Sequence, residues 1–113
     1  MQAATQRALP RLRVGVIGGV DRAAALYERA LDRIGCSLEH HTGQMAGRGA
    51  AGLAALIDRV DLVVIVTDVN SHNAVIAARR LAVARHRRHV LVRRCSPSGL
   101  VKRVSALADI PPC

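Results

Sequence analysis

Aromatic side chains are almost missing from this chain of 113 residues, which has no Trp, no Phe and a single Tyr, Tyr27. Proteins that bind single-stranded nucleic acid commonly stack its bases on aromatic rings, so the composition argues against that mode of binding. Half of the residues are nevertheless hydrophobic, and nearly all of these are Ala, Val, Leu or Ile. A core of small and β-branched residues suits a parallel sheet that helices cover on both faces.

Cysteine and long apolar runs are also scarce. Cys36, Cys95 and Cys113 form no C-x-x-C pair, which argues against a disulfide framework and against a zinc site. No apolar stretch approaches the roughly 20 residues of a membrane span, and the first residues lack the apolar segment of a signal peptide. We therefore expect a cytoplasmic protein without membrane contact.

Acidic residues are few: eight Asp and Glu oppose seventeen Lys and Arg, which gives a net charge of +9, and Lys102 is the only lysine. A basic surface attracts nucleic acids, anionic membranes and small anions. An Ala- and Arg-rich, Lys-poor composition is also typical of a high-GC genome, in which the arginines need no ligand to explain them. Nucleic-acid binding is therefore the secondary interpretation of the charge.

Strand and helix patterns alternate along the chain. The predicted strands cover residues 13–17, 36–40, 62–66 and 89–93, and the predicted helices cover about 21–34, 49–59, 71–85 and 97–108. Asp21 is suited to cap the first helix, and Asn70 or Ser71 the third. Four such alternations predict an α/β fold, a three-layer domain with a four-stranded parallel sheet and helices on both faces. We expect this domain at residues 13–108, between a leader at 1–12 and an irregular tail at 109–113.

Polar residues gather where the predicted strands end. They are Gly18, Gly19, Asp21 and Arg22 after the first strand; His40, His41, Thr42 and Gly43 after the second; Thr67, Asp68, Ser71, His72 and Asn73 after the third; and Arg93, Arg94, Ser96 and Ser98 after the fourth. The carboxyl ends of parallel strands share one edge of the sheet, and ligands bind beyond that edge. The sequence therefore predicts a ligand site there.

The Gly18-Gly19 pair allows two interpretations. The segment GVIGGVDR lacks the third Gly of the G-x-G-x-x-G fingerprint, so classical NAD binding is not expected. The pair either forms a tight turn between strand and helix, or it cradles an anion at the start of a helix, with Arg22 holding a carboxylate or phosphate.

The histidines at this edge are the candidate ligands for a metal. His40 and His41 are adjacent on a strand end and should point to opposite faces, so they are not expected to bind one ion together. His41 lies nearer the Gly-containing loop and is the better candidate of the two. His72 either belongs to a helix cap or is a ligand, because neutral imidazole binds heme iron and zinc readily. Asp68 or Asn73 could orient its second nitrogen.

The predicted ligand edge offers few residues that could catalyse a reaction. Ser71, His72 and Asp68 are close in sequence, but this closeness does not create the geometry of a catalytic triad. No G-x-S-x-G motif is present, and Asp68 is the only obvious carboxylate at the edge. The run RHRRH at residues 85–89 belongs to the opposite edge, where it forms either a solvated basic turn or a phosphate-binding patch. A binding protein is favoured over an enzyme.

The quoted residues resemble a family. The segments VGVIGGVDR, LEHHTG and DLVVIVTDVNSHNA, a Tyr in the first helix and a final strand followed by RR.S are similar to the bacterial domain of unknown function 2325, from Arg13 to Leu107. SHNA and HH.G are the most specific parts. The resemblance implies a compact Rossmann-like α/β unit and, for some members, heme held through histidine. Gln44 replaces a usual second Gly, and Arg79 and Arg80 stand where a Lys near a Cys is usual, so roles of those residues do not carry over.

We therefore predict a heme-binding protein, with iron held by His72 or His41 and an oxygen-binding or gas-sensing role. The expected cofactor contacts are Gly18, Gly19, Arg22, His41, Ser71, His72, Asn73 and Arg93. Arg22, Arg93 and Arg94 would pair with heme propionates, which suit bidentate guanidinium groups. Heme b requires a large apolar slot, so we expect a homodimer that forms the slot between its subunits. The alternative is a nucleic-acid or nucleotide-responsive regulator that uses the basic surface.

Overall fold

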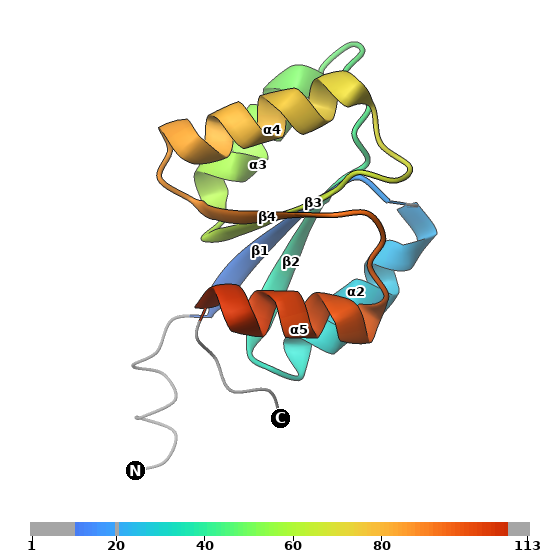
Figure 1. Ribbon diagram of the computed structural model, residues 1–113, viewed down its shortest axis with the longest axis vertical. Helices are drawn as coiled ribbons and strands as arrows, with labels where there is room; N and C mark the ends of the chain where they lie inside the picture. Colours follow the sequence, from blue (N-terminus) through green and yellow to red (C-terminus); the bar gives the residue numbers. More distant parts are fainter. Residues whose placement is uncertain (1–10, 20, 109–113) are drawn as a thin grey trace.

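The computed structural model describes residues 11–19 and 21–108. Four parallel strands form one sheet: β1 (Leu12–Ile17), β2 (Cys36–His41), β3 (Leu62–Val66) and β4 (Arg88–Val92). The helical elements are η1 (Asp21–Ala23), α2 (Ala24–Asp32), α3 (Gly49–Arg59), α4 (His72–Ala84) and α5 (Pro97–Ala108). In Figure 1 the sheet lies between two helical layers, with α3 and α4 on one face and α2 and α5 on the other. The predicted α/β class and its three layers are confirmed.

The strand order is β2-β1-β3-β4. The chain passes from β1 to β2 on one side, and then returns to place β3 on the other side of β1. The order therefore reverses between β1 and β3, and this is the switch point at which ligands enter sheets of this kind. The loops that follow the strands lie on the right in Figure 1.

Strand β3 is the centre of the core, as its uniformly apolar sequence predicts. All five of its residues are buried. Val64 packs toward α2 and α5 with Leu31 and Leu100, whereas Val63 and Ile65 pack toward α3 and α4. This alternation follows the two-residue period of a strand and explains why a doubly covered strand is apolar throughout.

Small residues let the helices approach the sheet in this core, where Tyr27 is a buried aromatic side chain among aliphatic ones. Ala74, Ala78 and Ala82 line the buried face of α4 and are fully inaccessible to solvent. Gly15 in β1 lies under α3, and a Cβ atom there would come 2.7 Å from Leu56 Cδ2. Close packing of aliphatic groups thus replaces the bulk that larger side chains supply in other domains.

Element boundaries differ from the prediction in several places: β1 begins at Leu12, inside the predicted leader, β2 ends at His41, and α4 covers His72–Ala84. The first α-helix does not start at Asp21: a 3-10 turn occupies Asp21–Ala23, and α2 begins at Ala24 without a side-chain cap. Strand β4 begins and ends one residue earlier than predicted. The cap at Ser71 is confirmed, because its Oγ accepts a hydrogen bond from Ala74 N at 3.1 Å. The predicted tail at 109–113 and most of the predicted leader lie outside the described residues.

Within residues 11–19 and 21–108, no helix combines the length and the apolar character that crossing a membrane requires.

Candidate functional site

The loops after β1, β2 and β3 are joined to one another at the carboxyl edge of the sheet. Gly18 N donates to His41 O at 2.7 Å, which links the ends of β1 and β2. Gly19 N donates to Val69 O at 2.9 Å, which links the β1 loop to the loop after β3. The structure therefore brings together the segments that the sequence places after these strands.

Asn70 occupies the switch point itself. Its Nδ2 donates to Val66 O at 2.7 Å and to Ile17 O at 3.3 Å, which are the last carbonyls of β3 and β1. Its Oδ1 accepts from Ser71 N at 2.8 Å. The side-chain amide thus closes the position between β1 and β3 where a ligand would otherwise approach the strand ends. The sequence predicts only a helix cap for Asn70, because an Asn just before a helix is typical of that role.

Gly18 and Gly43 leave the space that Asn70 needs. Both have a left-handed backbone, with φ of +97° and +95°. A Cβ atom at Gly18 would lie 2.5 Å from Asn70 Nδ2, and one at Gly43 would lie 2.0 Å from Asn70 Oδ1. Contacts this short are not tolerated, so any side chain at either position displaces the Asn70 amide. The tight-turn interpretation is sufficient to account for Gly18.

Ser71 has two structural roles. Its hydroxyl donates to Gly43 O at 2.6 Å while its oxygen caps α4 through Ala74 N. One short side chain therefore fixes both the start of α4 and the loop after β2.

His40 and His41 point in different directions, as their adjacent positions on a strand require. His40 Nε2 lies 2.9 Å from Gly18 O. His41 Nδ1 accepts from Gly43 N at 2.9 Å, so its proton is on Nε2, which donates to Gly49 O at 2.8 Å. Both nitrogens of His41 are therefore used by the β2–α3 loop, and a metal could bind there only after one of these bonds had opened.

His72 differs from these two histidines. It is the first residue of α4, its side chain is exposed, and it makes no hydrogen bond or ion pair with the described residues. Asn73 beside it is also exposed. Arg22 and Arg93 are exposed at the same edge and form no ion pair within the described part of the chain. These four exposed side chains have no ion pair within the described part of the chain and are available to a ligand.

Asp68 is directed to β4 rather than to His72. Arg94 Nε donates to Asp68 Oδ2 at 2.5 Å, and this hydrogen bond lowers the pKa of the Asp68 carboxyl below its ordinary value of 3.8. Asp68 N also donates to Arg93 O at 3.0 Å. No three His, Cys, Asp or Glu side chains of the described residues are grouped so as to hold a metal ion.

At the opposite edge, the basic run at residues 85–88 is bound to the ends of helices. Arg85 Nε donates to Asp58 Oδ1 at 2.6 Å. Arg87 donates to the backbone carbonyls of Asp58 and Arg85, both at 3.0 Å, and Arg88 donates to Leu107 O at 2.6 Å. The guanidinium groups of Arg87 and Arg88 thus satisfy carbonyls at helix ends that have no partner within the helix, and Arg85 pairs with a carboxylate. The run therefore has a structural role, because it connects the ends of α3 and α5 to the start of β4 and the segment before it.

The fold and this edge define a small three-layer α/β protein with a parallel sheet whose switch point is closed by its own side chains. Residues 13–107 match the family described as uncharacterized protein conserved in bacteria (DUF2325), and the chain belongs to that family. The resemblance seen in the sequence is thereby confirmed. No curated protein and no solved structure matches the chain.

Proposed function

We propose that this protein is a small ligand-binding module, not an enzyme, and that its ligand binds at the carboxyl edge of the sheet through His72. The observation that carries the proposal is the contrast among the three histidines at this edge. The ring nitrogens of His41 are used by the backbone, and His40 reaches Gly18 O, whereas the His72 ring is exposed and makes no bond with the described residues. A neutral imidazole in that position is available to a metal or a ligand.

Heme is the ligand that we propose first. The donor groups suit it: His72 would hold the iron through a ring nitrogen, and Arg22 and Arg93 would pair with the propionates. Heme, when bound, supplies an iron that can bind oxygen and other diatomic gases. The surroundings of His72 on one chain suit heme less well, because Ser71 and Asn73 on either side are polar and exposed. Val69, which is 59% exposed, is the nearest exposed large apolar side chain along the sequence.

A homodimer is therefore part of the proposal. Heme needs apolar walls on both faces, and a second copy of the chain would supply the missing wall by covering the exposed side of His72. A binding role also agrees with the carboxylates at this edge, because Asp68 is already paired with Arg94 and its lowered pKa makes it a poor proton acceptor near neutral pH.

Titration with hemin tests this proposal. The wild-type protein should produce a saturable shift of the Soret band, and sedimentation should show that the loaded form is a dimer. His72→Ala should abolish the shift. His86→Asn is the matched control, since His86 is exposed at the opposite edge with a φ of +56°, a conformation that Asn tolerates. An unsaturable response, or equal losses in the two variants, would contradict the proposal.

A nucleotide- or nucleic-acid-responsive regulator is the second candidate. The observation that favours it is a basic hollow of about 690 Å³ beside the end of β4, lined by Arg93, Arg94 and Arg103 together with Leu91 and Val92. The basic run at residues 85–88 is already engaged, so this hollow is the better place for a phosphate.

A gel-shift titration at low salt separates the two candidates. If nucleic acid is the ligand, Arg93→Gln with Arg103→Gln should weaken binding and flatten its dependence on salt, because fewer counterions are released. His72→Ala should leave this binding unchanged. An absence of any shift at low salt removes this candidate.

A further inference from the structure

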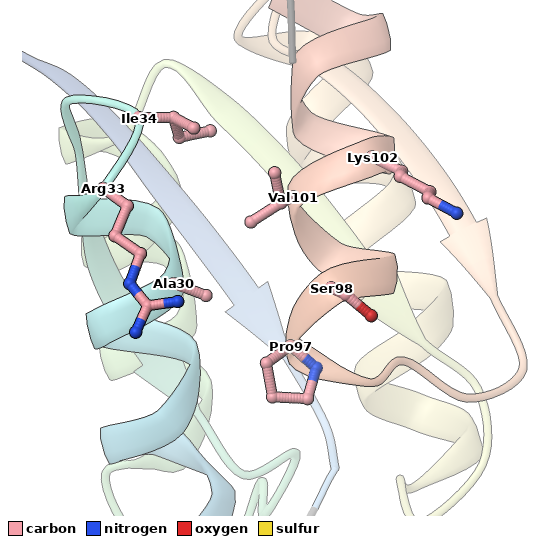
Figure 2. Close-up of a pocket in the computed structure, with 7 residues that line it drawn as sticks. All are labelled: Ala30, Arg33, Ile34, Pro97, Ser98, Val101 and Lys102. Carbon is pink, nitrogen blue, oxygen red and sulfur yellow. The ribbon is translucent and has the colours of Figure 1, made fainter. Parts of the chain in front are cut away.

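A groove of about 580 Å³ lies between α2 and α5. These two helices cover the face of the sheet opposite α3 and α4 (Figure 1). Its apolar surface is formed by Ala30 of α2, Ile34 just after α2, and Pro97 and Val101 of α5. Figure 2 shows Ile34 and Val101 pointing toward one another across the space between the two helices. Ser98, one of the polar residues after β4, also lines this groove, but His72 and the other proposed heme contacts do not, so a ligand here would be independent of His72.

The charges at the groove are all of one sign. Arg33, which caps the C-terminus of α2, and Lys102 of α5 also line it, and no acidic residue does. Neither cation forms an ion pair or a side-chain hydrogen bond with the described residues. In Figure 2 the Arg33 side chain lies alongside α2 near Ala30, whereas Lys102 extends from the side of α5 that faces away from α2. Arg33 is therefore the better placed of the two to pair with a bound anion.

We propose that this groove binds a small amphiphilic anion, a molecule with an extended apolar body and one carboxylate or sulfonate group. The volume falls within the range of small-molecule sites, roughly 300–1,000 Å³. The apolar body would cover the four aliphatic side chains, and the anionic group would neutralise Arg33. Cations without acidic neighbours keep a positive potential over an apolar surface, which attracts such a ligand.

Two further features favour this occupant. Leu26 is 52% exposed and lies four residues before Ala30, on the same side of α2, so the apolar strip extends beyond the groove in the direction of the helix. A long aliphatic chain would use this extra surface. A second copy of the protein, in contrast, would bring its own Arg33 and Lys102 against the same cations, and like charges in contact oppose binding.

Fluorescence of 8-anilinonaphthalene-1-sulfonate, an apolar anion, tests the proposal on the full-length protein. The dye should bind saturably at one site, and decanoate should displace it at a concentration about fivefold lower than uncharged decanol does. Arg33→Gln should weaken dye binding about two- to fivefold, and Lys102→Gln by less, because both charges are partly screened by solvent. Val101→Glu should weaken it roughly tenfold or more, since a carboxylate in the groove repels the anion.

Arg29→Gln is the matched control. It removes one positive charge from the same helix but lies outside the groove, so it should leave dye binding unchanged. His72→Ala should also have no effect, which separates this inference from the proposed function. Equal losses in Arg29→Gln and Arg33→Gln, equal potency of decanoate and decanol, or the absence of saturable binding would overturn the proposal. If the protein forms a dimer that does not bind the dye, and only the dissociated monomer binds it, then a second copy covers the groove and the proposal is wrong.

Discussion

The two edges of the sheet hold their loops together with different chemistry. At the carboxyl edge, the short neutral side chains of Asn70, Ser71 and His41 bond to backbone atoms. At the amino edge, the long guanidinium groups of Arg87 and Arg88 do so. Both edges meet the same requirement, because backbone groups at the ends of strands and helices have no partner within their own element.

The difference between the edges is one of reach. An Asn amide extends only a short distance, so the loops must come close to it, and Gly18 and Gly43 make this approach possible. An arginine reaches several ångströms and needs no glycine beside it. The stability of the carboxyl edge should therefore fall when a substitution adds atoms at Gly18 or Gly43. The stability of the amino edge should fall mainly when a substitution removes an arginine charge or its hydrogen-bond donors. Some arginines of this basic protein therefore hold loops and helix ends together, and other arginines stay exposed to ligands.

The largest effect should come from Gly43→Ala. The new Cβ would lie 2.0 Å from Asn70 Oδ1, and the residue would have to keep a φ of +95°. We expect a loss of about 3 kcal/mol in the free energy of unfolding, measured by urea denaturation. Combining it with Asn70→Ala removes the clash but not the backbone strain, so the double variant should lose less than the sum of the single losses. Strict additivity would show that the two residues do not interact.

Asn70→Ala should come next. It leaves the carbonyls of Ile17 and Val66 without their side-chain donor, which should cost about 2 kcal/mol of unfolding free energy. Asn70→Asp should be no better, because a carboxylate accepts hydrogen bonds but cannot donate to carbonyls. Asn73→Ala, at an exposed position in the same segment, is the control and should change stability by less than about 0.5 kcal/mol. Similar losses of unfolding free energy in Asn70→Ala and Asn73→Ala would show that the Asn70 amide has no special role at the switch point.

Arg87→Gln tests the amino edge. It removes three bonds to carbonyls of Ile57, Asp58 and Arg85, so we expect a loss of about 1 kcal/mol in urea denaturation. Arg93→Gln carries the same change of charge at an exposed position and should be close to neutral. If the two variants were equally stable, the hydrogen bonds made by residues 85–88 would have no measurable effect on stability.

The smallest effect concerns Asp68 and its dependence on pH. The hydrogen bond from Arg94 lowers the pKa of Asp68 in the folded protein, so this pair adds stability above the ordinary pKa of 3.8, and the contribution disappears as the pH falls through the lowered value. Asp68→Asn should therefore be slightly less stable than wild type at pH 7, and the difference should vanish in acid. Denaturation curves at both pH values measure this, and a difference that grew in acid would contradict it.

Local patterns were enough to predict much of this molecule. The uniformly apolar run at Leu62–Val66 marked the central strand because a strand covered on both faces has no solvent side. The cap of α4 was predicted at Asn70 or Ser71, because a cap depends on residues only three positions apart, and the structure shows that it is Ser71. The position of α2 was predicted less well, since nothing near Asp21 in the sequence distinguishes a 3-10 turn from the start of an α-helix.

The amino-acid sequence by itself determined the α/β class, the parallel sheet and the gathering of polar residues after the strands, because periodicity and capping act over a few neighbouring residues. Only the tertiary structure decided the strand order, the closure of the switch point by Asn70, and the contrast between the engaged ring of His41 and the exposed ring of His72. Those features depend on partners far apart in the chain, such as Asn70 and Ile17, and packing of the whole sheet brings such partners together.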